Sequence, residues 1–356
     1  MSYFFVFSLN RTSEHTPEHE QTPKSKYFDD WYNSEDETSP EEEIQLFEQI
    51  RQMPDDNSLL VRRKNGYKVV ASNLPWVQKG PSGILYNEGL QLYYAGRVNA
   101  LAYHSSGDLY VGAANGGLWK SAFITLVNKS DEVPSLRIGS VAVVPSDENH
   151  IFLGTGDYDD GLNGAGLFHS TDKGETWNKL ELTPKNPRRV SQILIFGTNV
   201  LVGSDRGIYL STDLGNSWSR TLDSNVCSMS MAEDESYILA GVNGRGVWKS
   251  TTQGTTWGKI WSKKFPSLDS SNLGRISVAV SQSQPSRAYV QVGNPGSANP
   301  LGLYKTTNSG NTWSMITTPS TDYLGQQSYN NVLLVHPTNP DIVWAGGLSL
   351  WRTSDG

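Results

Sequence analysis

Acidic and amide side chains crowd one segment of the sequence, at positions 156–163. The segment reads Gly-Asp-Tyr-Asp-Asp-Gly-Leu-Asn. Oxygen ligands at this density suit calcium, and the candidate ligands are Asp157, Asp159 and Asn163. However, the glycine comes one position too early for an EF-hand loop, and no bidentate glutamate follows. Two alternatives stay open: a solvated turn, and an acidic lip with Asp157, Asp159 and Asp160 facing a substrate.

Four arginines form a second group with binding chemistry, because each begins a run of alternating apolar residues. They are Arg97, Arg137, Arg189 and Arg275. A guanidinium offers a planar fork of donors that matches a carboxylate. If the runs converge, the arginines form a partial cationic ring for an acidic ligand, with Tyr158 or Tyr329 able to stack on a sugar. Each arginine could instead serve the structure alone, by donating to carbonyl groups of a neighbouring element.

Other catalytic and metal-binding patterns are missing from the sequence. Cys227 is its only cysteine, which excludes an intramolecular disulfide and a multi-cysteine metal site. None of the six histidines stands at metal-ligand spacing from another, and no nucleophile elbow supports a catalytic serine. We therefore expect no cofactor, and no metal apart from the calcium alternative.

The net charge of -7 is concentrated in the first part of the chain, since residues 1–60 carry 14 acidic and 4 basic side chains. The remainder has a small positive charge, too little for a protein that binds the phosphate backbone, so we expect no nucleic acid partner. No apolar run is long enough to span a bilayer. The composition of residues 1–38 predicts a disordered acidic arm. Ser39-Pro40-Glu41-Glu42 then predicts a short helix, at about 40–53 within a helix-and-linker segment 39–65.

One eight-residue pattern occurs four times, with Ser or Thr first, Gly fifth and Trp eighth. The copies start at positions 170, 211, 250 and 306, and a fifth begins at 353 where the sequence stops, so the starts are 39 to 56 residues apart. That spacing is close to the length of one four-stranded propeller blade. The residues that define the pattern are Ser170, Asp172, Gly174, Trp177, Ser211, Asp213, Gly215, Trp218, Gly254, Trp257, Gly310 and Trp313.

Apolar runs precede each copy in a regular order. A strand such as 207–210 comes directly before the pattern, a run such as 199–203 lies upstream of it, and the arginine-led runs come first. These read as the third, second and innermost strands of successive blades. The sequence therefore predicts an all-β propeller over residues 66–356, with about six recognisable blades. We expect it to be truncated at its C-terminus, as a fragment of a larger propeller.

The repeated pattern resembles the Asp box of the β-propellers that include sialidases, sortilin and xyloglucan hydrolases. The resemblance implies a tight hairpin in which the Asp carboxylate accepts backbone N–H groups, Gly takes a positive φ and Trp packs between sheets. Thr252 and Asn308 stand at the Asp position in two copies. A turn tolerates this change, but a catalytic acid would not, so the boxes are expected to be structural.

Stretches such as 110–120 and 336–340 resemble large secreted bacterial proteins of the same group. The resemblance implies export and a ligand on the face opposite the boxes. Sialidases of this group carry an Arg-Ile-Pro segment that is absent here, and xyloglucan hydrolases carry a catalytic Asp where this chain has Ala114. We therefore expect a secreted or surface module that binds a polysaccharide or extended peptide without catalysis. A glycoside hydrolase and a sortilin-like sorting or assembly scaffold are the alternatives, and the oligomeric state stays open.

Overall fold

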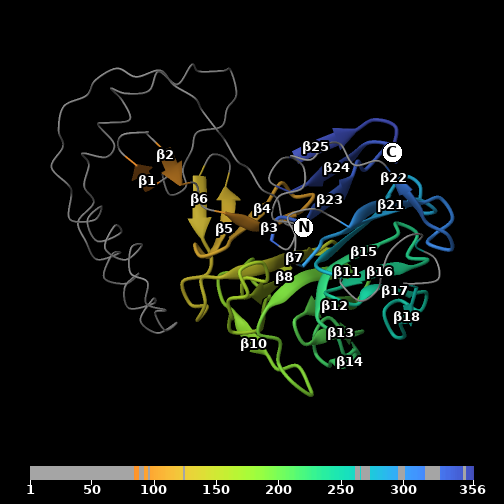
Figure 1. The fold of residues 1–356 in the computed structure, drawn as a ribbon. Helices are drawn as coiled ribbons and strands as arrows, with labels where there is room; N and C mark the ends of the chain where they lie inside the picture. The colour runs from red at the N-terminus through yellow and green to blue at the C-terminus, as the bar shows by residue number, and fades with distance from the viewer. Residues whose placement is uncertain are drawn as a thin grey trace, which may run out of the picture. The chain divides into compact units, whose positions relative to one another are not determined.

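The computed structural model describes residues 84–87, 92–94, 97–122, 125–260, 265, 273–295, 301–316, 329–347 and 350–356. The expected acidic arm, the helix and its linker lie outside these residues. Within them the chain is all β, and inside each sheet every strand pairs in antiparallel fashion with its neighbour along the chain (Figure 1). The described residues contain no helix long and apolar enough to cross a membrane.

Six sheets follow one another, after a small ladder of β1 (Ile84–Asn87) and β2 (Leu92–Tyr94). The first has β3 (Val98–Tyr103), β4 (Leu109–Ala113), β5 (Leu118–Ala122) and β6 (Thr125–Asn128). The second has β7 (Ile138–Val144), β8 (Asp147–Thr155), β9 (Leu167–Ser170) and β10 (Asn178–Leu180). The third has β11 (Val190–Phe196), β12 (Asn199–Ser204), β13 (Gly207–Ser211) and β14 (Ser219–Leu222).

The fourth sheet has β15 (Val226–Met231), β16 (Ile238–Val242), β17 (Gly246–Ser250) and β18 (Gly258–Lys259). The fifth has β19 (Ile276–Val280), β20 (Ala288–Val292), β21 (Gly302–Thr306) and β22 (Ser314–Ile316). The described part of the sixth has β23 (Val332–Val335), β24 (Val343–Gly346) and β25 (Leu350–Thr353). The repeat therefore predicted the number and order of these sheets.

The first strands of the six sheets lie next to one another. Along the series β3, β7, β11, β15, β19 and β23, each strand contacts the next. This arrangement of meandering sheets around a shared set of inner strands is a β-propeller. The four arginines Arg97, Arg137, Arg189 and Arg275 stand directly before β3, β7, β11 and β19. The fold thus brings the ends of these strands, and the arginines with them, to one face.

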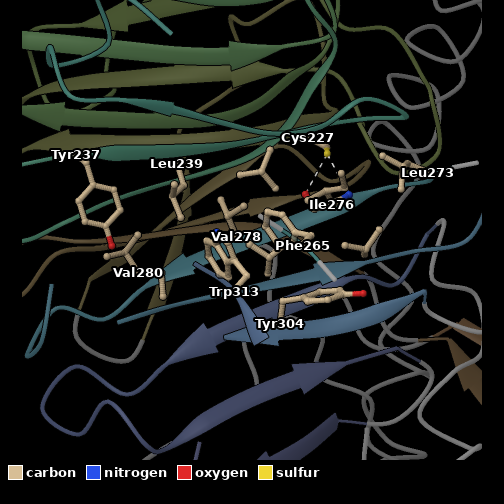
Figure 2. Packing of buried hydrophobic residues seen from close by; sticks show 14 of the residues in the cluster. Cys227, Tyr237, Leu239, Phe265, Leu273, Ile276, Val278, Val280, Tyr304 and Trp313 are labelled. Atoms are coloured by element: carbon tan, nitrogen blue, oxygen red, sulfur yellow. Dashed lines mark hydrogen bonds between the residues drawn. The ribbon is translucent and has the colours of Figure 1, made fainter. Parts of the chain in front are cut away.

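Apolar side chains fill the space between neighbouring sheets, and Figure 2 shows the cluster between the fourth and fifth sheets. Phe265 stacks on Trp313 there, with ring centroids 4.8 Å apart. Cys227 on β15 is buried in the same cluster, and its thiol donates to the Ile276 carbonyl at 3.1 Å. Burial raises the pKa of this thiol, and Cys227 is part of the apolar packing between the sheets.

Each box forms a turn between the third and fourth strands of its sheet. In the first box Ser170 Oγ accepts from the Gly174 N–H at 2.8 Å, and the Asp172 carboxylate accepts from the backbone and hydroxyl of Thr176 at 2.9 and 2.6 Å. Gly174 has a φ of 84°, which favours glycine. The Trp177 indole donates to the Lys129 carbonyl of the preceding sheet at 2.6 Å. The first box therefore stabilises its hairpin and ties the second sheet to the first.

Candidate functional site

The segment 157–163 forms the connection between β8 and β9, on the face where the inner strands begin. A backbone bond from the Asp157 N–H to the Leu162 carbonyl, at 2.9 Å, closes it into a compact loop. Inside the loop, Asp157 Oδ1 accepts from the N–H groups of Asp159 and Asp160 at 3.0 and 3.3 Å. The segment is therefore an ordered loop held by its own first carboxylate, which we call the acidic loop.

All four arginines predicted from the sequence contact the acidic loop. Arg97 pairs with the carboxylates of Asp157 and Asp160. Arg275 pairs with Asp159. The other two donate to backbone carbonyls of the loop, Arg137 to Asn163 at 3.4 Å and Arg189 to Gly161 at 2.9 Å. The cationic ring and the acidic segment, which the sequence presents as separate features, form one assembly in which they face each other.

Asp157 is the most strongly perturbed carboxyl group of the loop. Its side chain has no exposed surface, and that burial raises its pKa to about 6 against the opposing effect of the Arg97 charge. The nearby carboxylates of Asp160 and Asp159 add to the rise. Buried carboxyls with a raised pKa occur often at functional sites, but burial in the folded loop is by itself enough to raise the pKa of Asp157.

Tyr158 and Asp159 point inward, between the inner strands. The Tyr158 hydroxyl donates to Asn225 Oδ1 at 2.6 Å, and the Arg275 guanidinium lies 5.8 Å from the centroid of its ring. Little space remains beside them: a pocket of about 10 Å³, room for about one water molecule. Its lining comes from the acidic loop and from five inner strands or their entries: Asn99, Gly139, Tyr158, Asp159, Ser191, Cys227 and Arg275. The acidic loop therefore fills the space between the entries of these inner strands, the central channel of the propeller.

Tyr329, which precedes β23, completes the assembly. Its hydroxyl accepts from Arg97, whose guanidinium carbon lies 5.0 Å from the ring centroid, and its carbonyl accepts from Arg275 at 3.0 Å. Tyr158 and Tyr329 are thus each in contact with an arginine. A sugar ring that stacks on either would have to share the aromatic face with a guanidinium or use its other face.

The calcium alternative can be compared with the donor atoms present. The carboxylates of Asp157 and Asp159 face guanidinium groups, and the carbonyl of Asn163 accepts from Arg137. Among the residues that the structure describes, no group of three or more His, Cys, Asp or Glu side chains is arranged to hold a metal ion. Calcium would need to displace arginines, so these residues do not fit that ion as they stand.

Two residues of this face were not singled out by the sequence. Asn225 is the partner of Tyr158, and Asp205, in the β12–β13 turn, has a side chain only 1% exposed that lies within 3.1 to 3.8 Å of Arg188, Arg189 and Arg206. A lone Asn before a strand carries no distinctive signal. The dense Arg188-Arg189 and Asp205-Arg206 pairs would have been the sequence signal for the second cluster.

Comparison with curated proteins gives two sequence relatives, both xyloglucanases. The chain is 27% identical over 183 residues to a xyloglucanase of Paenibacillus sp., a match of 42% of this chain and 17% of that protein. It is 30% identical over 139 residues to xyloglucanase Xgh74A of Acetivibrio thermocellus, a match of 38% of this chain and 13% of that protein. The matches therefore span less than a fifth of either relative. No family model matches the chain.

Solved structures agree on the fold. A GH74 enzyme of Niastella koreensis superposes with a TM-score of 0.55 and 22% identity, over 72% of this chain and 45% of that one. YCF48 bound to D1 peptide superposes with a TM-score of 0.52 and 17% identity, over 80% of this chain and 85% of that one. Identities this low carry the fold alone. The chain is a β-propeller with sequence similarity to xyloglucanases.

Proposed function

We propose that this chain is a carbohydrate-active propeller of the xyloglucanase type, which binds and cleaves a β-glucan on the face that carries the acidic loop. The observation that carries the proposal is the sequence similarity to two xyloglucanases. It favours hydrolysis over the non-catalytic binding expected from the sequence. We further infer that the boxes are Asp boxes, as in the propeller group they resemble, and that the protein is secreted, since polysaccharides of this class are extracellular.

Glycoside hydrolysis needs a carboxylic acid and a carboxylate. Asp157, with its pKa of about 6, and the partly exposed Asp160 are two neighbouring carboxyls of the acidic loop in different environments. Because the Asp157 side chain is fully buried under Arg97, a substrate reaches it only if the guanidinium moves. Catalysis at this position therefore requires the acidic loop to open.

A second candidate is a binding module without catalysis. Ala114 supports it, because the resembling hydrolases carry a catalytic Asp there. The Ala114 N–H donates to the Arg97 carbonyl at 2.9 Å and its side chain is buried. A methyl group at this position supplies no proton, so the site would retain glucan contacts but lose turnover.

An assay for new reducing ends on xyloglucan, with affinity measured in parallel, separates the two. Turnover that Asp157→Asn abolishes, while the exposed control Glu181→Gln retains it, supports the hydrolase. Binding of xyloglucan without turnover supports the module. Absence of both turnover and binding overturns the carbohydrate proposal, and binding of extended peptides in its place would favour the sorting or assembly scaffold.

A further inference from the structure

A second concave site lies on the same face, beside the acidic loop, where the third and fourth sheets meet. It is a pocket of about 330 Å³ lined by Lys185, Asp205, Arg206, Arg220, Asp223, Ser224, Asn225 and Arg245. The volume is at the lower end of the range of small-molecule sites. We call it the basic pocket, because four cationic side chains line it against two carboxylates.

The residues come from loops and strand ends that the propeller brings together. Lys185 lies between β10 and β11, Arg206 in the β12–β13 turn, Arg220 on β14 and Arg245 in the β16–β17 turn. Gly207 allows β13 to pass close to β14. Its φ is 133°, and a Cβ there would lie 3.1 Å from Arg220 Cδ and collide with the Leu222 carbonyl. The third sheet therefore carries two of the cations on neighbouring backbone segments.

The two carboxylates leave much of this positive charge uncompensated. Asp205 is already shared, since Arg188, Arg189 and Arg206 all lie within 3.8 Å of it. Asp223 pairs with Arg220 at 2.9 Å, but its side chain is 75% exposed. Lys185 and Arg245 form no ion pair with a carboxylate among the residues that the structure describes, and Arg245 reaches Ser224 Oγ over 3.4 Å. The free charge thus lies at Lys185 and Arg245.

The geometry points to a binding site for a sugar acid, a monoanionic carboxylate with neighbouring hydroxyl groups. Guanidinium forks match a carboxylate. The exposed Asp223 carboxylate and the polar side chains of Ser224 and Asn225 can accept from or donate to hydroxyls beside it. The cations would attract a doubly charged phosphate, but the Asp223 carboxylate would repel it. The mixed lining therefore favours a uronic acid over an inorganic oxyanion.

This inference goes beyond the proposed function, because a neutral glucan needs no cationic pocket. Asn225 joins the two regions, since its side chain accepts from Tyr158 of the acidic loop and also lines the basic pocket. A polysaccharide that carries uronic acid branches could therefore contact both. Binding of the free sugar acid, however, depends on the basic pocket alone and is measurable whether or not the chain cleaves xyloglucan.

The test is calorimetric titration of the full chain with glucuronate, glucose, sulfate and phosphate. We expect glucuronate to bind, glucose to give no heat, and the Lys185→Gln/Arg245→Gln double variant to bind glucuronate at least tenfold more weakly. Both side chains are exposed and outside the apolar core, so the double variant should keep the wild-type Tm. The matched control is Lys179→Gln, an exposed cation on β10 that does not line the pocket.

Three results would overturn the inference. The first is equal glucuronate binding by the double variant and the wild type. The second is glucose binding as tightly as glucuronate, which would show that charge plays no part. The third is sulfate or phosphate binding as tightly as glucuronate, which would leave an inorganic anion site. Turnover of xyloglucan by the double variant at the wild-type rate would show that this site and the proposed function are separable.

Discussion

Arg97 and Tyr329 are in contact although 232 positions separate them, with the Arg97 guanidinium carbon 5.0 Å from the centroid of the Tyr329 ring. Arg97 stands directly before the first strand of the first sheet, and Tyr329 shortly before the first strand of the sixth. The same guanidinium also pairs with Asp157 and Asp160, on the loop of the second sheet. One side chain therefore joins three sheets at the channel face.

Replacing Arg97 should destabilise the fold more than replacing an ordinary surface cation. Arg97→Ala leaves the Asp157 carboxylate buried without its partner, and removing one member of a buried pair costs about 3–5 kcal/mol. Lys179→Ala is the control, because Lys179 and Glu181 are 46% and 67% exposed and such pairs contribute about 0–1 kcal/mol. Denaturant unfolding at pH 7.5 measures both. Equal losses in the two variants would contradict a structural role for Arg97.

Asp157 should make the stability depend on pH between about 4 and 6. Its folded-state pKa of about 6 is raised above the ordinary value of 3.8, so the folded state holds the proton more tightly than the unfolded state. The stabilisation is fully present below pH 4 and is lost as the pH rises through 6, by about 3 kcal/mol. The difference in unfolding free energy between the wild type and Asp157→Asn, followed from pH 4 to 7, isolates this contribution. A difference that stays constant over that interval would exclude it.

The sequence predicted which residues lie at the candidate site better than it predicted which of them contact each other. An apolar run follows each of four arginines, which predicts that each stands at a strand entry, and the structure confirms this for Arg97, Arg137, Arg189 and Arg275. Their pairing with the acidic loop could not be derived, because it depends on how closely the inner strands approach one another. Local periodicity carries no information about that distance.

The boxes show the same division between local and long-range information. Their internal hydrogen bonds follow from residue types at fixed spacing, so the turn was predictable. The residue before each box glycine is also left-handed, with φ of 62° at Lys173 and 52° at Leu214. Neither residue type favours this conformation, so nothing in the sequence indicated it. The hydrogen bonds on either side of the residue over-determine the backbone there.

The first box should tolerate Asn better than Ala at position 172. In the fourth box Asn308 already accepts from the Thr312 N–H at 2.9 Å and donates to its hydroxyl at 2.8 Å. Asp172→Asn should therefore keep the turn, whereas Asp172→Ala should lose roughly 1 kcal/mol at neutral pH. Thermal unfolding of the wild type, Asp172→Asn and Asp172→Ala measures their order of stability.

Acid should weaken the turn of the first box, because Asp172 is protonated only at low pH. Hydrogen bonds from the Thr176 side chain and backbone and from Ser170 lower the pKa of Asp172 to about 2. A depressed pKa gives stabilisation that is present above about pH 4 and is lost as the pH falls towards 2. The gap between the wild type and Asp172→Ala should therefore narrow over this interval. A gap that widens on acidification would contradict the assignment of the carboxylate as the acceptor.

A close backbone approach on the inner strand β7 gives a sharp steric prediction. Gly139 lies on the inner strand β7, and a Cβ added there would collide with the carbonyl oxygens of Val190 and Gly156. Neither is the flexible end of a side chain, so Gly139→Ala must push β7 away from β11 and from the base of the acidic loop. We expect a loss of at least about 2 kcal/mol, as for other overpacked sites.

Gly258→Ala is the matched control for this substitution, because the nearest atom to an added Cβ there is 3.9 Å away. It should change the unfolding free energy by less than about 0.5 kcal/mol. Denaturant unfolding of both variants measures the loss of stability, and titration with glucuronate measures any effect on the basic pocket. Since the basic pocket lies between the third and fourth sheets, Gly139→Ala should lower stability and leave that affinity within about twofold. A Gly139→Ala protein as stable as the wild type would contradict the close approach of β7 to the Val190 and Gly156 carbonyls.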